Sequence, residues 1–435
     1  MQPACAGYGK CGGCTLQHLC YPAQLKWKQE QLANALKLLP FWNMARESVV
    51  LPTCVPSPDP LGYRSRVKLV AAAQKDGRVI LGAYAPRSHE VVDMAGCKVN
   101  LPSLTLLADS IAKAATELGL SCFDEAGGSG ILRYVLLRET STGVQQLSLV
   151  VADLPTDAQL AAFVKLLKKS HPNLASIVLH RNTARGNALL GSTLSSDGAA
   201  SSGGAEGGEL GTADDDRVLL GEAHVWEQME APEPDLLAET RAASGARLRV
   251  SARSFLQVNR AIASRIYAAA AALVPAGSQV LDLYCGVGGL GLTVLGQVPS
   301  ARLLGIETSA SAIADAVAGA QAAGFGPDRA RFLCGAVELL LPEVQNVDPA
   351  GVCANSHEVA LLNPPRRGCF PAVLQALLIR QPARIIYVSC NPTSLARDLE
   401  VLCSAGYSLR QATPYDMHPG TPHIETLAVL DRVGS

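Results

Sequence analysis

The sequence contains no apolar run long enough to cross a membrane, and it does not open with a basic stretch followed by an apolar one. Without a membrane segment or a secretory signal, the chain is predicted to be cytoplasmic and to have no membrane partner. Disulfides are rare in that compartment, so the 13 cysteines are expected to be thiols or metal ligands. With 435 residues, of which 48% are hydrophobic, the chain can form two or three domains with cores of their own.

The sequence also has almost no net charge, but its acidic residues are unevenly distributed. A stretch over 192–216 is rich in Ser, Gly and Ala and holds six carboxylates: Asp197, Glu206, Glu209, Asp214, Asp215 and Asp216. Without these six charges, the net charge of −1 becomes +5 for the remainder, which is compatible with a nucleic-acid partner. The stretch has too little apolar surface to fold, so we expect a disordered acidic insert there.

Four cysteines lie close together near the N-terminus: Cys5, Cys11, Cys14 and Cys20. Three of them in the pattern Cys-x5-Cys-Gly-Gly-Cys suggest a metal site, which usually needs a fourth ligand. Cys20 and the distant Cys97 are the two candidates. Zinc and a [4Fe–4S] cluster both accept four thiolates, so the spacing does not separate them, and a chance grouping of free thiols is the bland alternative.

An amphipathic connecting helix is predicted after the cysteines, over about 22–38, carrying Lys26, Lys28 and Lys37. Beyond it, Arg64, Arg66 and Lys68 alternate with small or apolar residues, so a strand would place them on one face. Such a row suits phosphates, and it equally suits a charged edge strand that resists further pairing. Strand-like runs at 131–138, 145–151 and 175–179, with a helix over 156–169, predict an α+β domain.

A glycine-rich turn follows the next strong strand signal, at 280–283. Gly286, Gly288 and Gly291 satisfy the spacing of a dinucleotide-binding loop, which makes a nicotinamide-dependent oxidoreductase one hypothesis. The preceding Asp-Leu-Tyr-Cys is more typical of an S-adenosylmethionine site. A second strand ends in Glu307, whose carboxylate can accept hydrogen bonds from ribose hydroxyls.

Two further strands end in polar motifs. Asn363-Pro364-Pro365 fixes an amide side chain where the strand exits, because the prolines stiffen the chain. Enzymes that methylate exocyclic amines of bases place an aromatic residue after such prolines, and Arg366 stands there instead. The apolar run at 385–389 ends at Cys390.

Cys390 is followed by an Asn-Pro break, and Thr393 is predicted to cap the next helix. The thiol then lies at a helix N-terminus, which stabilises a thiolate, and at a strand end, where α/β sheets bind ligands. A buried structural cysteine is the alternative. A terminal antiparallel pair at 407–413 and 424–430 is predicted, and the residues joining it include Asp416, His418, His423 and Glu425.

Together these motifs resemble the RNA uracil-C5 methyltransferases that depend on S-adenosylmethionine. The resemblance covers nearly the whole chain: the cysteine cluster, Ser-Phe-Leu-Gln-Val-Asn at 254–259, Asp-Leu-Tyr-Cys-Gly-Val-Gly-Gly at 282–289, Asn-Pro-Pro-Arg-Arg-Gly at 363–368, Ser-Cys-Asn-Pro at 389–392 and His-Ile-Glu-Thr at 423–426. It implies an α/β fold with a class I, Rossmann-like methyltransferase domain over 245–435. A central α+β RNA-binding domain at 59–244 and a small iron–sulfur segment at 1–58 would precede it.

Within that family a cysteine cluster is typical of the ribosomal RNA enzymes. The resemblance implies a [4Fe–4S] centre held by Cys5, Cys11, Cys14 and Cys97. The chain starts almost at the cluster, with no small β-barrel RNA-binding domain before it, and Asn363 stands where many relatives have Asp. Both features most resemble the shorter, RlmC-like branch, which implies 23S ribosomal RNA as the partner and no obligate protein partner. A transfer RNA, or more than one ribosomal site, is the alternative, and the acidic insert has no expected counterpart in the family.

The proposed chemistry fits these residues. Uracil C5 is a weak nucleophile, and addition of the Cys390 thiolate to C6 would convert it into an enolate. After methyl transfer a base must remove the C5 proton before the thiolate leaves. By resemblance this base is Glu425, with His423 as a chemical rival. The resemblance further implies that the cofactor contacts Gln257, Tyr284, Glu307 and Asn363, and that the target uridine swings out of the RNA. A non-catalytic iron–sulfur RNA-binding protein is a third hypothesis.

Overall fold

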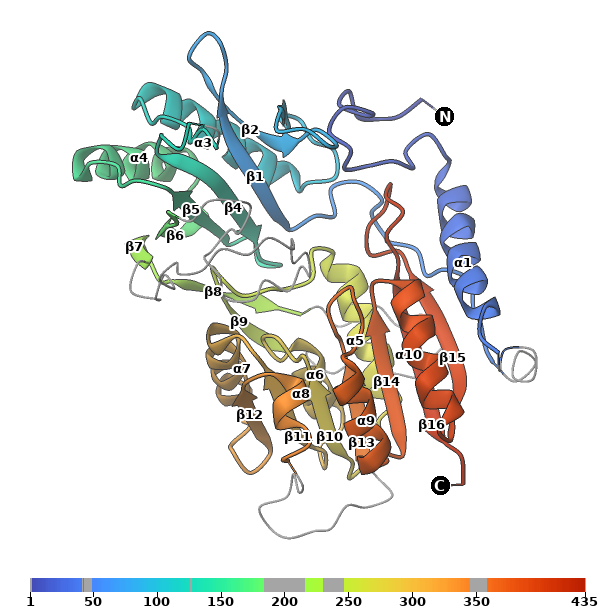
Figure 1. Cartoon of the computed structure of the whole chain (residues 1–435). Coiled ribbons are helices and arrows are strands. Elements are labelled where there is room, and N and C mark those ends of the chain that lie inside the picture. The colour runs from blue at the N-terminus through green and yellow to red at the C-terminus, as the bar shows by residue number, and fades with distance from the viewer. Residues whose placement is uncertain are drawn as a thin grey trace.

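The computed structural model describes residues 2–40, 42, 49–125, 127–183, 216–229, 246–344 and 358–434. These residues form two seven-stranded sheets, a two-stranded sheet, and helices packed on them (Figure 1). Among them, no helix combines the length and the apolarity needed to cross a membrane.

The C-terminal sheet has the strand order β12-β11-β10-β13-β14-β16-β15. The pairs from β12 to β14 are parallel, and β16 then runs antiparallel between β14 and β15. In chain order, the strands of this sheet are β10 (Gln279–Leu283), β11 (Arg302–Glu307), β12 (Ala330–Cys334), β13 (Glu358–Leu362), β14 (Arg384–Ser389), β15 (Tyr407–Tyr415) and β16 (Glu425–Arg432). This is the sheet of a class I methyltransferase, and it agrees with the predicted fold class.

Helices cover both faces of this sheet, which explains why its inner strands are continuous apolar runs. One face packs against α5 (Arg260–Ala272), α6 (Gly289–Gln297) and α7 (Ala310–Ala322). The other packs against α8 (Val337–Leu340), α9 (Pro371–Arg380) and α10 (Pro392–Ser404). The predicted strand ends therefore all emerge at one edge, between two helical layers (Figure 1).

The N-terminal helix α1 (Tyr21–Lys37) belongs to this C-terminal core. Its residues Leu32 and Leu36 are buried in the same cluster as α9 and α10, and the helix packs against α10 and β15. The chain after it then runs beside β15, with parallel bridges from Val50 to Gln411 and from Val55 to Tyr415. The first and last parts of the sequence thus lie side by side (Figure 1).

The central sheet has the order β3-β2-β1-β4-β5-β6-β7, and it is antiparallel except between β5 and β6. Its strands are β1 (Arg66–Ala73), β2 (Val79–Tyr84), β3 (Val91–Asp93), β4 (Leu132–Glu139), β5 (Gln145–Val151), β6 (Leu174–Arg181) and β7 (Asp216–Leu220). Helices α3 (Pro102–Glu117) and α4 (Asp157–Ser170) cover one face. Thr156 and Gln159 form a capping box that starts α4, as the sequence predicted to within a residue.

The predicted cationic row is only partly a strand. Arg66 and Lys68 lie on β1, over the rings of Phe255 (5.7 Å) and Tyr134 (4.7 Å). Arg64 precedes the strand, and its backbone instead forms an isolated parallel β-bridge with Asn100. The row therefore divides because β1 begins two residues later than predicted.

The acidic insert lies outside the described residues except at its end. Asp216 is the first residue of β7, and its carboxylate accepts hydrogen bonds from Arg253 and pairs with His180. The predicted disordered stretch is therefore wrong at Asp216, because two basic partners fix that carboxylate. The predicted domain boundary at 244/245 also falls outside the described part of the chain.

The two-stranded sheet of β8 (His224–Gln228) and β9 (Arg247–Ser251) links the two larger units, because β8 contacts β5 and β6 while β9 packs against α7. Arg138 of β4 is buried and donates to the carbonyl oxygens of Ser251 (3.2 Å) and Ser254 (2.7 Å). Burial lowers the pKa of this guanidinium to about 9, so its hydrogen bonds replace the water it has lost. The loop after β9 is consequently held by the central sheet.

Candidate active site

The glycine-rich turn after β10 is a left-handed turn that opens a helix. Tyr284, Gly286 and Gly288 all have positive φ angles, of 63°, 55° and 79°, and Gly288 is the N-cap of α6. Asp282 is fully buried beneath the turn and accepts a hydrogen bond from the Gly291 N–H at 3.0 Å. Burial raises the pKa of Asp282 to about 7. The turn is thus fixed to α6, with its backbone amides at the end of the strand.

Glu307 lies beside this turn, because β10 and β11 are parallel neighbours. Its carboxylate accepts hydrogen bonds from the N–H groups of Gly286 (3.2 Å) and Ser309 (2.9 Å). The side chain is half-buried, so it keeps acceptor capacity toward solvent. Glu307 therefore stands where a nucleoside ribose binds in folds of this kind.

Asn363 lies across the turn from Glu307. Its N–H donates to the Leu283 carbonyl oxygen (3.3 Å), and β13 and β11 flank β10 on opposite sides. The gap between these strand ends is the topological switch point, where open α/β sheets bind ligands. Tyr284 packs its ring against the core on the α8–α10 face, beside Cys369. Because the ring is in the core, only the backbone of Tyr284, which is in the left-handed conformation at the strand end, faces the switch point.

The loop that carries Gln257 is anchored from below. Asp315, fully buried on α7, accepts hydrogen bonds from Ser251 N–H (2.7 Å) and from Ser254 Oγ (2.6 Å). Phe255, the next residue, is 45% exposed, and Gln257 is half-buried. Asn259 ends the loop and caps α5 by accepting a hydrogen bond from the Ile262 N–H.

Cys390 follows β14 directly and precedes α10. The helix begins at Pro392, and its cap is Asn391, whose Oδ1 accepts from the Thr393 N–H at 3.1 Å. The prediction that Thr393 caps the helix is wrong, because proline fits the first helical position and moves the cap back to Asn391. The thiol of Cys390 is half-buried and lies one residue before the cap.

Glu425 is the first residue of β16, the strand next to β14. The last pair in the antiparallel register is Ser389 with Thr426, and the residues just beyond it are Cys390, which follows the end of β14, and Glu425, which begins β16. Cys390 and Glu425 therefore lie at neighbouring strand ends. The carboxyl group is fully buried, which raises its pKa to about 8. A thiol and a buried carboxyl group are thus brought to the same edge of the sheet.

His423, the rival base, lies two residues away on the same loop. Its Nδ1 is 3.4 Å from the Arg366 guanidinium, and burial together with the charge of Arg366 lowers its pKa. Arg366 is itself tied to the thiol's turn, since its carbonyl oxygen accepts from Asn391 Nδ2 at 3.0 Å. The Asn-Pro-Pro-Arg turn and the cysteine turn therefore form one rim.

The four predicted cluster ligands are also neighbours. Burial raises the pKa of Cys14 to about 11, with further contributions from the nearby Cys97 and Cys11, and Cys5 acts in the same way on Cys97. Gly12 has φ +68°, and a Cβ there would lie 2.5 Å from the Pro86 side chain, so only glycine fits this tight turn. In the described residues, no three Cys, His, Asp or Glu side chains converge where a single metal ion would fit. Four thiols from two segments are nonetheless the donor set that an iron–sulfur cluster uses.

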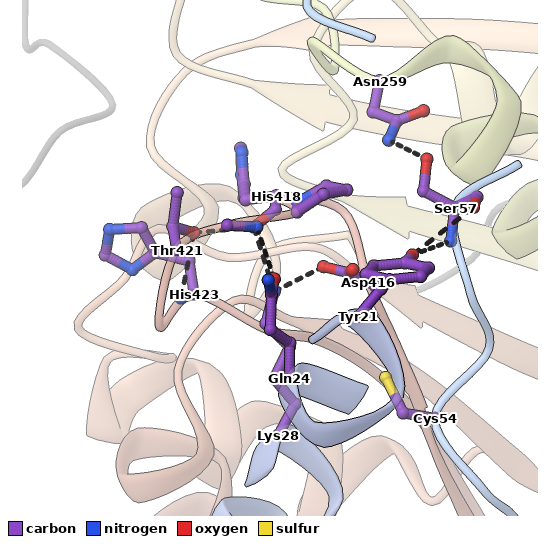
Figure 2. A network of polar contacts seen from close by, with 12 residues as sticks. Tyr21, Gln24, Lys28, Cys54, Ser57, Asn259, Asp416, His418, Thr421 and His423 are labelled. Carbon is purple, nitrogen blue, oxygen red and sulfur yellow. Dashed lines mark hydrogen bonds and ion pairs between the residues drawn. The ribbon is translucent and has the colours of Figure 1, made fainter. Parts of the chain in front are cut away.

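Sequence reasoning missed the residues that hold this site from behind. Asp315 and Arg138 anchor the Gln257 loop, and Lys28 forms a buried ion pair with Asp416 (Figure 2). Their sequence signal is weak, because one charge within an apolar stretch does not reveal its distant partner.

Comparisons with known proteins match this geometry. A family model described as tRNA (Uracil-5-)-methyltransferase matches residues 233–433. Uncharacterized RNA methyltransferases from Halalkalibacterium halodurans and Thermosynechococcus vestitus are both 32% identical, over 99% of this chain and 83% and 84% of their own lengths. The crystal structure of a tRNA (uracil-54, C5)-methyltransferase from Pyrococcus abyssi, in complex with S-adenosyl-L-homocysteine, has the same fold. It covers 96% of this chain and 86% of its own, with a TM-score of 0.68 and 24% identity.

These relatives overturn the hypothesis of a nicotinamide-dependent oxidoreductase, whose only support was the glycine spacing. They extend over both sheets and over the N-terminal segment, so the likeness is not confined to a common cofactor-binding fold. The chain belongs to the RNA uracil-C5 methyltransferases, which take their methyl group from S-adenosyl-L-methionine.

Proposed function

We propose that this enzyme methylates C5 of a uridine in 23S ribosomal RNA, with Cys390 as nucleophile and Glu425 as base. The observation that supports the mechanism is the sheet register, which pairs Ser389 with Thr426 and so brings the neighbouring Cys390 and the buried Glu425 to adjoining strand ends. Both groups lie at the edge of the sheet that also holds Glu307 and Asn363.

The residues divide the reaction between them. The Cys390 thiolate adds to C6 of uracil, forming a C–S bond and moving the electron pair of the double bond toward C5 as an enolate. S-adenosyl-L-methionine would supply the methyl group: C5 bonds to the methyl carbon, and the bond between that carbon and the sulfonium sulfur breaks, leaving S-adenosyl-L-homocysteine. The Glu425 carboxylate then removes the C5 proton, the C5–C6 double bond re-forms, and Cys390 leaves as the thiolate.

Burial of Glu425 suits this last step. A carboxylate with a pKa near 8 is a stronger base than one in water, although only a minority is ionised at neutral pH. His423 has a lowered pKa beside Arg366, which makes it the weaker base of the two. We therefore assign proton removal to Glu425.

We assign cofactor binding to Gln257, Tyr284, Glu307 and Asn363. Glu307 keeps acceptor capacity for ribose hydroxyls, and the left-handed turn at Tyr284 presents backbone amides at the switch point. As an amide, Asn363 can donate and accept hydrogen bonds but cannot act as a base.

RNA would approach over the central sheet and the loop after β9. Arg66 lies against the exposed ring of Phe255, and the exposed Lys68 lies over the buried ring of Tyr134, so two cations and one accessible aromatic ring lie on this side of the site. Phosphates favour the cations, and an unstacked base can stack on Phe255. We therefore keep the prediction of a central RNA-binding domain at 59–244. We also keep the separate prediction that the enzyme is cytoplasmic.

Cys5, Cys11, Cys14 and Cys97 would hold a [4Fe–4S] cluster. Methyl transfer needs no electron, so its chemistry here would be structural, joining the N-terminal segment to the residues after β3. Protein purified without oxygen should contain about four irons and absorb in the visible range. Stoichiometric zinc without iron would contradict this assignment, and Cys20→Ser serves as the control that keeps the iron.

The cysteine segment favours ribosomal RNA as the substrate, by resemblance to the ribosomal branch of the family. Transfer RNA is the second candidate, because the Pyrococcus abyssi enzyme acts on it. Purified enzyme with labelled S-adenosyl-L-methionine should label unmodified 23S ribosomal RNA and leave transfer RNA unlabelled. The reverse pattern would reject the ribosomal assignment while keeping the mechanism.

A further inference from the structure

The loop over 416–424 connects β15 to β16 and ends at Glu425. Its backbone is held by the N-terminal part of the chain. The Gly420 N–H donates to Gln24 Oε1 (2.9 Å), and the Gly420 carbonyl oxygen accepts from the Leu16 N–H (2.9 Å). The Pro419 carbonyl oxygen accepts from the Tyr63 hydroxyl at 3.2 Å. The loop that delivers the base is therefore fixed by residues about 400 positions earlier in the sequence.

At the centre of these contacts is an ion pair between Lys28 of α1 and Asp416 (Figure 2). Both side chains are completely buried. Lys28 Nζ also donates to the His418 carbonyl oxygen at 2.9 Å, and the Asp416 N–H donates to the Val55 carbonyl oxygen at 2.9 Å. Two successive parts of the loop are thus tied to one ammonium group.

A buried ion pair is a poor source of stability. Removing both charges from water costs most of what their attraction returns, and apolar residues of similar size often stabilise a fold as well. What the pair provides instead is a defined geometry, because ammonium and carboxylate groups tolerate few positions when no water is present. Helix α1 already packs through Leu32 and Leu36, so Lys28 is not required to bury it.

We propose that Lys28 and Asp416 are a positioning pair for the base, with α1 acting as a brace behind the active-site loop. The proposal rests on the proposed role of Glu425. The pair fixes the loop over 416–424, the loop fixes where β16 begins, and the beginning of β16 sets the position of Glu425 beside the end of β14, where Cys390 follows. Lys28 and Asp416 act through the loop that leads to Glu425, so they affect proton removal and leave the addition of Cys390 to C6 unchanged.

The test is the double variant Lys28→Met/Asp416→Leu, which removes both charges without leaving one alone in the core. It should fold, bind S-adenosylhomocysteine, and trap a 5-fluorouridine RNA at the wild-type rate. An RNA–protein adduct should accumulate with ordinary RNA, and kcat should fall at least tenfold. KM for RNA should fall in parallel, because kcat/KM is set by the earlier steps, which are unchanged. Lys26→Met on the same helix is the matched control, because Lys26 is exposed and pairs only with Glu30 at the surface.

Amide hydrogen exchange gives a readout that needs no activity. Exchange over 417–424 should be at least tenfold faster in the double variant, while exchange in β14 should match the wild type. Wild-type kcat in the folded double variant overturns the proposal. If the wild-type enzyme forms no adduct with 5-fluorouridine RNA, the proposed function is wrong. Independently of that result, unchanged exchange over 417–424 in the double variant would show that the ion pair does not hold the loop.

A second variant covers the case in which the double variant does not fold. Lys28→Gln/Asp416→Asn removes both charges but keeps polar side chains of similar size that can still form a hydrogen bond, so it weakens the pair without leaving a charge unpaired in the core. It should lower kcat about threefold and raise the adduct fraction in the same direction. An unchanged kcat and adduct fraction in this variant overturns the proposal.

Discussion

Cys390 lies where three local preferences meet: an apolar strand ends, proline starts a helix, and Asn391 caps it. The sequence predicted the thiol's position from this pattern, since each preference acts within a few residues. The partner at Glu425 lies 35 positions later, and only the sheet register brings it close. That register depends on β16 inserting between β14 and β15, which no local pattern specifies.

Cys390→Ala should abolish methylation while leaving S-adenosylhomocysteine and RNA binding within a few-fold of the wild type. The methyl side chain cannot add to C6, so no adduct with 5-fluorouridine RNA should form on a denaturing gel. Cys369→Ala is the control, because Cys369 is buried behind the site and burial raises its pKa to about 12. An adduct in the Cys390→Ala enzyme would place the nucleophile elsewhere.

Glu425→Gln should separate addition from release. The variant keeps the thiol, so it should form an adduct with ordinary RNA, and turnover should fall by a factor of a hundred or more because the proton is not removed. In the wild type, release should speed up about tenfold per pH unit and level off above pH 8, where the carboxyl group is ionised. Single-turnover release rates between pH 6 and pH 9 measure this profile, and a flat profile would favour His423.

The same carboxyl group gives a stability signature. Its folded pKa lies above the ordinary value of 4.5, so the protonated form is favoured by folding, and that stability is lost as pH rises through about 8. Glu425→Gln does not ionise. Its melting temperature should therefore gain on that of the wild type as pH is raised from 5 to 9.

At the scale of the element, the turn between β10 and α6 combines what sequence could and could not predict. The glycines predicted a tight turn at a strand end, because only glycine readily adopts positive φ. The close packing at Gly291 could not be predicted from the sequence. This residue has no positive φ, and glycine is required there because the helix lies directly against Asp282 and Leu303.

Gly291→Ala should damage this turn. A Cβ there would lie 2.7 Å from the Asp282 carboxylate and 2.8 Å from Leu303, so α6 must shift, at a cost of about 1–3 kcal/mol. Affinity for S-adenosylhomocysteine should fall with it. Gly296→Ala on the same helix is the control, since a Cβ there meets nothing within 4 Å and should stabilise the helix by about 1 kcal/mol. Equal melting temperatures for the two variants would contradict this account.

At the scale of the whole molecule, sequence reasoning separated the chain into segments that the structure partly merges. The helix over 22–38 was predicted as a connector, yet α1 is part of the C-terminal core. Its apolar residues fixed one buried face, but Lys28 on the same helix is buried too, because its partner Asp416 lies 388 residues away. Periodicity cannot locate such a partner, so the long-range arrangement had to come from the structure.

The acidic insert also belongs to this scale. Replacing residues 192–215 with a short Gly/Ser linker should leave methylation within a few-fold, and it should strengthen RNA binding at low salt because five carboxylates are removed. Asp216 must be kept, since it pairs with His180 and Arg253. Binding curves at two salt concentrations test this, and complete loss of activity in a folded variant would show that the insert takes part in catalysis.

The position of β16 has a consequence for how the enzyme is made. The strand that begins with Glu425 is synthesised after β14 and β15, yet in the folded sheet it lies between them, and β15 contacts residues made early, at Val50 and Val55. β14 and β15 are therefore joined only through β16, which pairs with both. A nascent chain that already contains Cys390 still lacks Glu425, and with it the strand that completes this edge of the sheet, until a further 35 residues have been added.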